Sequence, residues 1–200
     1  MSLKWKHTKA AKNVFDVDVS VSKEPSEHDH YVLLRSDAHH DNPKADHELE
    51  KYHLDNAVQR NASILDNGDL FCAMQGNYDR RKSKDDIRPE HQHGDYLDRL
   101  VDTAHEFYKP YAKNFIFMGQ GNHETAILKN HETDLTSRLV ERLNTTEQST
   151  IYAGTYTSWV RFRFKVHGRH RNTIILWRHH GYGGDAPVTK GTIQTARIAN

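Results

Sequence analysis

Four short clusters of polar side chains follow apolar segments of this chain. In chain order they are Asp37-Ala38-His39-His40-Asp41, Gly68-Asp69, Gly121-Asn122-His123-Glu124 and His179-His180-Gly181. Carboxylate, imidazole and amide groups together suit cations such as manganese, iron or zinc, and the lack of paired cysteines argues against a structural zinc site. Each cluster alone could also be a polar turn rich in histidine, so the hypothesis of a metal site depends on their combination.

The spacing of the candidate ligands allows two ions to be held side by side. Asp37 and His39 are two residues apart just after an apolar segment and can converge on one ion if the turn redirects the second side chain. Asp69 could bridge two ions, because a carboxylate has two oxygens and the preceding glycine permits a close approach. Asn122 offers an amide oxygen and His180 an imidazole to the second ion, while the neighbouring His179 competes with His180 for that role.

The segments around these clusters predict an α/β fold in which strand–helix units come first and hairpin strands follow. We expect strands at 14–21, 31–36, 62–69 and 115–124, helices at 45–61, 96–114 and 133–144, and an antiparallel hairpin formed by 156–168 and 173–184. In open α/β sheets, ligands bind outside the carboxyl ends of the strands. The polar clusters are therefore expected at one edge of the fold.

The apolar pattern of each segment predicts its place in the fold. Residues 14–21 alternate apolar and polar side chains, which is typical of a half-buried edge strand, whereas the continuous apolar run at 31–36 indicates a strand buried on both faces. The helix at 45–61 carries Leu49, Tyr52, His53 and Ala57 at helical spacing. The helix at 96–114 is strongly amphipathic, and that at 133–144, with Thr133 as N-cap, turns Leu135, Leu139, Val140 and Leu143 inward.

Composition suits one domain over residues 1–200 and gives little sign of a membrane or nucleic-acid surface. The chain has 200 residues, 36% of them hydrophobic, and a net charge of +1, so no global field attracts polyanions. Its single cysteine, Cys72, excludes an internal disulfide framework and fits a reducing compartment. No apolar run reaches membrane-spanning length, and the first residues lack the apolar core of a signal peptide, so we expect a cytoplasmic protein.

The order of motifs, Asp-x-His, Gly-Asp, Gly-Asn-His-Glu and His-Gly, resembles the calcineurin-like metallophosphoesterase superfamily over roughly residues 30–185. "GQGNHE" is the most specific element, and "HHGYGGDAPVTKGTIQT" looks similar to members encoded by bacteriophages and bacteria. The resemblance implies a metallophosphatase-like sandwich of two mixed β-sheets flanked by helices, with a centre of two divalent ions (Mn, Fe or Zn). Members hydrolyse phosphomonoesters or phosphodiesters, including those in nucleic acids.

The resemblance also assigns roles to residues of this chain. It implies that Asp37 and His39 hold the first ion, that Asp69 bridges, and that Asn122 and His180 hold the second. His123 would not be a ligand: it would lie near the scissile ester, where it stabilises transition-state charge or protonates the leaving oxygen. We expect Glu124 to cap or orient the turn into the following helix.

Two features depart from the family pattern. An acidic residue often stands three places after the bridging aspartate, and here that place is Cys72, for which we expect a position in the core. The family also closes its site with a late Gly-His-x-His motif, and no histidine follows His180. Either the fold is incomplete at its C-terminal end, as expected for a fragment, or the site is short of two ligands.

Several residues keep two interpretations. His40 either faces the substrate or supports the site from behind, or it is an exposed turn residue. Arg80 and Arg81 could contact a phosphate backbone, but the acidic residues around them favour a solvated loop. Arg161, Arg163 and Lys165 could form a basic stripe beside a stacking aromatic, although the solvent face of a hairpin has the same pattern.

The function that these residues predict is hydrolysis of phosphate esters by a dinuclear metal centre. A phosphodiesterase or nuclease acting on nucleic acid or nucleotides is the preferred class. The alternatives are a protein phosphatase with the same chemistry and a binding module that keeps the fold but has an impaired site. The sequence predicts a phosphate ester as partner and names no protein partner.

Overall fold

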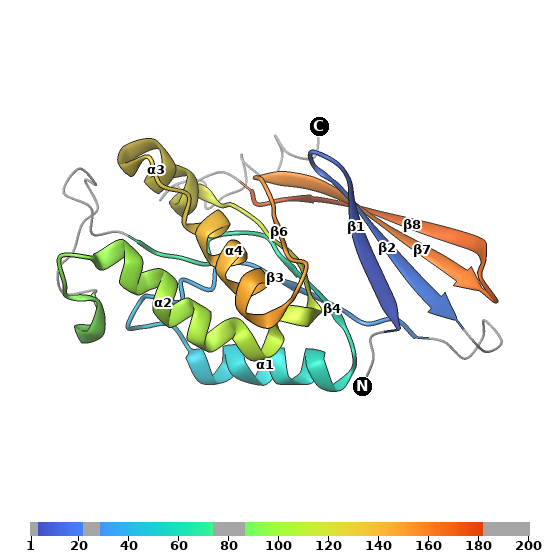
Figure 1. The fold of residues 1–200 in the computed structure, drawn as a ribbon, viewed down its shortest axis with the longest axis horizontal. Helices are drawn as coiled ribbons and strands as arrows, with labels where there is room; N and C mark the ends of the chain where they lie inside the picture. Colours follow the sequence, from blue (N-terminus) through green and yellow to red (C-terminus); the bar gives the residue numbers. More distant parts are fainter. Residues whose placement is uncertain (1–3, 22–28, 74–86, 182–200) are drawn as a thin grey trace, which may run out of the picture.

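The computed structural model describes residues 4–21, 29–73 and 87–181, and Figure 1 shows how their helices and strands are arranged. The strands are β1 (Trp5–Ala11), β2 (Val14–Val21), β3 (Val32–Arg35), β4 (Ser63–Asp66), β5 (Phe115–Met118), β6 (Tyr152–Ala153), β7 (Thr157–Val166) and β8 (Arg169–His179). The α-helices are α1 (His47–Gln59), α2 (Tyr96–Tyr108), α3 (Asn122–His131) and α4 (Leu135–Glu147); η3 (Pro89–His91) and η4 (Lys109–Asn114) are short 3₁₀ helices. Arg80 and Arg81 lie outside the described residues.

The strands form two four-stranded sheets, as expected for an α/β fold, but only one of the sheets is mixed. In the order β1-β2-β7-β8, the outer pairs are antiparallel and β2 runs parallel to β7. In the order β3-β4-β5-β6, every pair is parallel, so the expectation of two mixed sheets is wrong for this one. The reason is that helices connect its successive strands, and such crossovers bring the chain back in the same direction.

The parallel sheet is the middle layer of the fold. One of its faces packs against the helices, in a core that joins Ile64 and Phe115 to buried residues of α1, α2 and α4. The other face packs against the mixed sheet, where Leu65 and Phe117 meet Phe15 and other apolar residues of β2 and β7. Figure 1 shows the helices on one side of the molecule and the long strands β1, β2, β7 and β8 on the other.

The described part of the chain confirms several expected elements and corrects others. The hairpin of β7 and β8 and the inward faces of α2 and α4 are as predicted, although Asp134 and not Thr133 is the N-cap of α4. β2 is an internal strand between β1 and β7, not an edge. β3 is the edge of its sheet, where Leu34 is 54% exposed, so the expectation of a strand buried on both faces is wrong.

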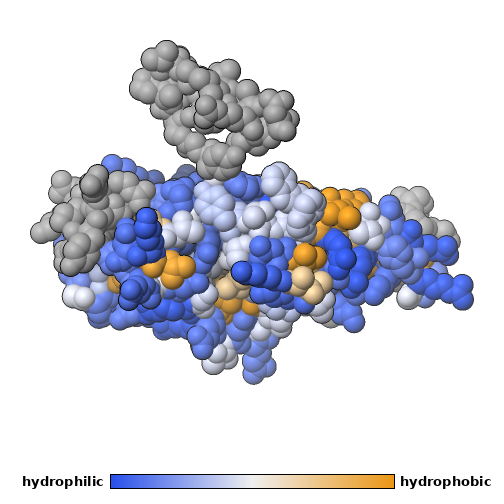
Figure 2. Space-filling model, turned by 90° about the horizontal axis from the view of Figure 1, so that it is seen from above, coloured by the Kyte–Doolittle hydropathy of each residue, from blue (hydrophilic) through white to orange (hydrophobic). Residues whose placement is uncertain are grey.

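The surface is mostly polar, in keeping with the composition. The face drawn in Figure 2 is predominantly hydrophilic, with hydrophobic patches that polar groups separate. None of the helices in the described ranges is both long and apolar enough to cross a membrane.

Candidate metal centre

The predicted polar clusters meet at the carboxyl ends of the parallel strands β3, β4 and β5. The loop after β3 runs beside the loop after β4, and three backbone hydrogen bonds join them: Asp37 N–H to the Gly68 carbonyl at 2.9 Å, His39 N–H to that of Asp69 at 3.0 Å, and His40 N–H to that of Leu70 at 2.7 Å. These hydrogen bonds continue the pairing of the two chain segments beyond the ends of β3 and β4. It sets the first two clusters side by side.

Three candidate ligands have left-handed backbone conformations, which side chains other than glycine adopt rarely. The φ angles are 57° at Asp37, 43° at His39 and 52° at Asp69. Each such residue costs about 1–2 kcal/mol relative to a right-handed conformation, so the hydrogen bonds between the loops must hold them in place. The side chains of these residues contribute to two groups of possible ligands, Asp37 and Asp69 to one and His39 to the other.

A glycine at the start of α3 allows the third cluster to approach this point. A Cβ atom added to Gly121 would lie 2.1 Å from Oδ1 of Asp69 and 2.6 Å from Cε1 of His180. These distances are far below van der Waals contact, so only glycine lets the start of α3, the Asp69 loop and the end of β8 come this close. The backbone N–H of His123 then donates to Oδ1 of Asp69 at 2.9 Å.

Asp37, Asp69 and His180 form the first possible metal position, which we call the acidic trio. One ligand atom from each lies within 4.8 Å of the others. Nδ1 of His180 is 3.1 Å from the Asn67 carbonyl oxygen, which can only accept, so this nitrogen carries the proton. Nε2 of the ring therefore faces Oδ2 of Asp69 and Oδ1 of Asn122, each 3.3 Å away. This arrangement is typical of metal-binding histidines, whose other nitrogen donates to a carbonyl group.

His39, Cys72 and His123 form a second possible position, which we call the thiol trio, again with ligand atoms within 4.8 Å of one another. Nδ1 of His123 is 2.7 Å from the Cys72 carbonyl oxygen, so Nδ1 carries a proton and Nε2 is the nitrogen that faces the trio. The pKa of His39 is lowered by burial and by His123, which keeps its ring neutral and able to bind a metal. Asp69 of the acidic trio lies beside the thiol trio, with Oδ2 3.9 Å from Nε2 of His123.

Buried carboxylates support the site from behind without entering either trio. Glu124 accepts hydrogen bonds from the backbone N–H groups of Asp69, Phe71 and Gly121 at 2.8–3.0 Å, which confirms its predicted capping role. Burial raises the pKa of Glu124 to about 7. Hydrogen bonds from backbone N–H groups act in the opposite direction, because they favour the charged carboxylate. Asp41 likewise accepts from the N–H groups of Cys72 and Ala73 at 2.5 and 2.8 Å. Both carboxylates fix the loop after β4.

Two predicted site residues take other positions. His40 is 2% exposed, and its Nδ1 lies 3.1 Å from Oε2 of Glu50, so the alternative in which it faces a substrate is wrong for this structure. It is enclosed because the side chains of α1 and α2 close over the loop after β3. The ring of His179 packs against Tyr156 and Trp177 and accepts a hydrogen bond from the Gly181 N–H at 2.8 Å, so His180 and not His179 enters the acidic trio.

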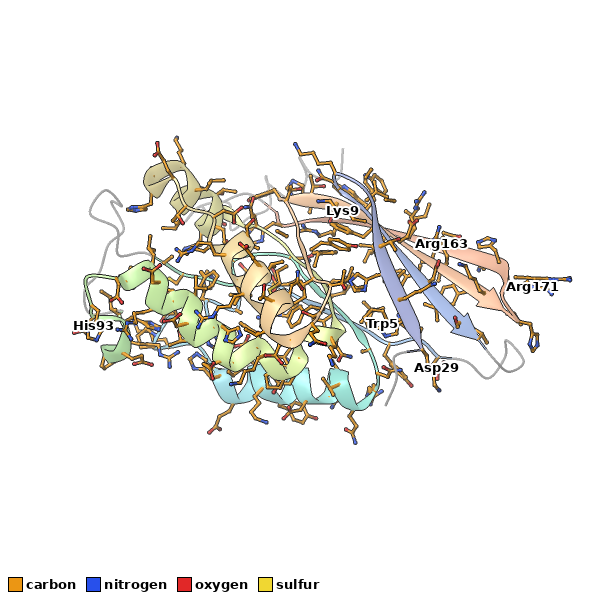
Figure 3. All side chains as sticks on the ribbon, viewed as in Figure 1. Trp5, Lys9, Asp29, His93, Arg163 and Arg171 are labelled. Carbon is orange, nitrogen blue, oxygen red and sulfur yellow. The ribbon has the colours of Figure 1, made fainter. Side chains whose placement is uncertain are left out.

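The three basic residues of β7 are paired with acidic residues of the neighbouring strand. Arg161 contacts Asp16 at 2.6 Å, and Arg163 and Lys165 each contact Asp18 at 2.7 Å. The parallel register of β2 and β7 sets these residues opposite one another, and Figure 3 labels Arg163 on this sheet. The predicted stripe is therefore largely neutralised by its own sheet.

The donor groups of both trios fit metal ions. In the acidic trio a lone pair and two oxygens face one another, an arrangement that repels unless a cation or a further proton lies between them. In the thiol trio, Nδ1 of His39 is buried without a hydrogen-bond partner among the described residues, which costs about 1–3 kcal/mol when nothing satisfies it. Cys72 is buried, which confirms the expected core position. Its spacing of three residues from Asp69 is the signal that it also shares the ligand loop.

Comparisons of the chain with protein-family models, with curated proteins and with solved structures give no match. The functional assignment therefore depends on the geometry of the two trios and on the sequence motifs that supply them.

Proposed function

We propose that this chain is a metal-dependent phosphoesterase of the calcineurin-like type, located in the cytoplasm, with two divalent ions at the carboxyl ends of β3, β4 and β5. The observation that carries the proposal is the convergence of Asp37, Asp69 and His180, because the facing electron-rich atoms require a positive charge between them. Divalent ions bound here would supply Lewis-acid stabilisation of phosphate charge and a water that ionises near neutral pH.

The residues of the site take different roles in the proposed reaction. Asp37, Asp69 and His180 hold the position through oxygen and nitrogen donors, and Asn122 adds an amide oxygen 3.3 Å from Nε2 of His180. The role that His123 can take depends on whether its ring carries one proton or two. The hydrogen bond to the Cys72 carbonyl fixes the first proton on Nδ1, so only the doubly protonated ring could donate a proton from Nε2 to a leaving oxygen.

We prefer nucleotides or nucleic acid as substrates because a row of aromatic rings leads from the exposed face of β7 and β8 toward the site. Trp159 and Trp177, 47% and 51% exposed, pair across β7 and β8 with their ring centroids 6.2 Å apart. The ring of Trp177 lies 5.8 Å from that of His179, and the ring of Tyr156 lies 5.3 Å from His179 and 5.2 Å from His180. Bases stack on such exposed aromatic rings with little regard to sequence, so a diester at the metals could keep its base on this row of rings.

The proposal is tested by hydrolysis of a chromogenic phosphodiester with added manganese. Asp69→Asn should lower the rate more than about a hundredfold, because it removes a carboxylate on which several kcal/mol of charge stabilisation depends. His170→Gln is the control: it removes an exposed imidazole beside Arg171, which Figure 3 labels at the tip of the β7–β8 hairpin. A diester that carries a nucleoside should be the better substrate.

Two results would speak against the enzyme. Turnover that does not depend on manganese, or an unchanged rate in Asp69→Asn, would contradict the metal mechanism. Manganese binding that Asp69→Asn abolishes, with no hydrolysis of any diester or monoester, would instead support a binding module on the same site.

A further inference from the structure

We propose that Cys72 is a metal ligand, and that with His39 and His123 it forms a softer position that prefers a zinc-class ion to manganese. The inference rests on the proposed function in one respect, because the two trios belong to the same site, where Asp69 of the acidic trio lies 3.9 Å from His123 of the thiol trio. It goes beyond that function by making the two positions chemically unequal and by making His123 a ligand. The resemblance expects neither of these properties.

The geometry brings the three donors almost to bonding distance of one ion. Zinc binds thiolate sulfur at about 2.3 Å and imidazole nitrogen at about 2.0–2.1 Å, so two donors of one tetrahedral ion lie roughly 3.5 Å apart. In the thiol trio, all three ligand atoms already lie within 4.8 Å of one another, and the rings of His39 and His123 meet edge to face at 4.7 Å. Each pair of donors therefore needs to approach by no more than about 1.3 Å to bind one ion.

Hydrogen bonds fix the ring of His123 and the backbone that carries the other two donors. Nδ1 of His123 donates to the Cys72 carbonyl at 2.7 Å, which holds Nε2 toward the trio. The backbone N–H of Cys72 is held by Asp41 at 2.5 Å, and that of His39 by the Asp69 carbonyl at 3.0 Å. The orphaned Nδ1 of His39 is a second observation, independent of the thiol, that points to a missing ligand. Two imidazole rings and a sulfur atom thus lie together on loops that hydrogen bonds join.

The donor set decides which ion each position prefers. The acidic trio supplies two carboxylates and one imidazole, which suit manganese, whereas the thiol trio supplies no carboxylate and one sulfur, which suits zinc or cobalt. Binding converts the Cys72 thiol to a thiolate: the S–H bond breaks, its proton passes to solvent, and sulfur donates the freed pair to the ion. No oxidant or reductant is needed.

Cobalt(II) is the probe, because a cobalt–thiolate bond produces a charge-transfer absorption in the near ultraviolet that oxygen and nitrogen ligands do not produce. The chain has one cysteine, so such a band can come only from Cys72. Titration of the full chain with cobalt should produce the band at one equivalent, and added zinc should remove it. Cys72→Ser should lack the band and bind cobalt at this position more than about tenfold more weakly. His170→Gln should behave as the unchanged chain.

The unchanged chain alone can overturn the proposal. If cobalt binds with no thiolate band, Cys72 is not a ligand, whatever the variants do. His123→Gln keeps the cysteine and should weaken the band and the cobalt affinity; an unchanged spectrum would remove His123 from the position. Manganese-dependent hydrolysis in a chain without the band would leave the proposed function standing, so the two proposals fail separately.

Discussion

At the scale of single residues, the histidines show how hydrogen bonds decide which nitrogen is available. The sequence leaves His179 as an alternative to His180, although the His-Gly pattern favours His180. The structure separates them because successive side chains of an extended chain point to opposite faces. Nδ1 of His180 donates to the Asn67 carbonyl, and its Nε2 faces Asp69. In contrast, Nδ1 of His179 accepts a hydrogen bond from the backbone N–H of Gly181.

The pair provides a matched comparison. His180→Gln should weaken manganese binding more than about tenfold, because it removes a donor of the acidic trio, and His179→Gln should change it much less. Calorimetric titration of both variants with manganese measures this. Equal losses, or the larger loss in His179→Gln, would mean that the end of β8 is oriented otherwise when metal is bound.

At the scale of elements, the site depends on a close approach between α3 and the loop after β4. Gly121→Ala should therefore weaken manganese binding more than about tenfold and lower the free energy of unfolding by about 1–3 kcal/mol, since the new Cβ would overlap Asp69 and His180. Gly94→Ala is the matched control, because a Cβ there meets no atom within 4 Å. Urea unfolding and metal titration measure the two effects. If both variants behave alike, the approach is not a constraint on the site.

The sequence predicted the elements that carry the site better than their surroundings. Strand ends and polar clusters could be located because parallel strands end at one edge, a rule that needs no packing detail. The buried face of α1 could not: Leu54 and Ala57 face the core, while Leu49 and Tyr52 are 50% and 61% exposed. The helix carries apolar residues on two faces, and which face is buried depends on how the helix packs against the neighbouring sheet. That depends on β3, whose edge position was likewise missed.

The site was also predicted unevenly. Asp37, Asp69 and His180 lie together and Asn122 lies beside His180, whereas the motif order grouped Asp37 with His39 on one ion and His180 with Asn122 on the other. The grouping of Cys72 with two imidazoles could not be predicted, because it follows from left-handed turns and from contacts between loops that no local pattern encodes.

At the scale of the whole molecule, a buried charge network joins α1 to the parallel sheet behind the site. Arg35 of β3 lies 2.7 Å from Glu50 of α1 and 2.8 Å from Asp66 of β4. Burial by itself would raise the pKa of Glu50, but the hydrogen bond of His40, the charge of Arg35 and the hydrogen bond of Tyr108 together lower it to about 2. The network thus holds the helix layer to the strands that carry the ligands.

This network predicts how stability depends on pH. Because the pKa of Glu50 is lower in the folded than in the unfolded chain, its contribution is present above about pH 4.5 and is lost as pH falls through about 2. Between about pH 5 and about pH 3, the free energy of unfolding should fall by about 2 kcal/mol more in the unchanged chain than in Glu50→Gln. Glu48→Gln, on the exposed side of the same helix, should keep the full pH dependence. Parallel slopes in all three proteins, from urea unfolding, would contradict the role of Glu50.

The central claim is that the ends of β3, β4, β5 and β8 form a metal centre, and its most direct test is to locate the ions. We would grow crystals of the full chain with manganese and measure anomalous scattering at the manganese edge. The account predicts a peak bounded by Asp37, Asp69 and His180. A crystal with manganese at other sites, and no peak among these three residues, would contradict it.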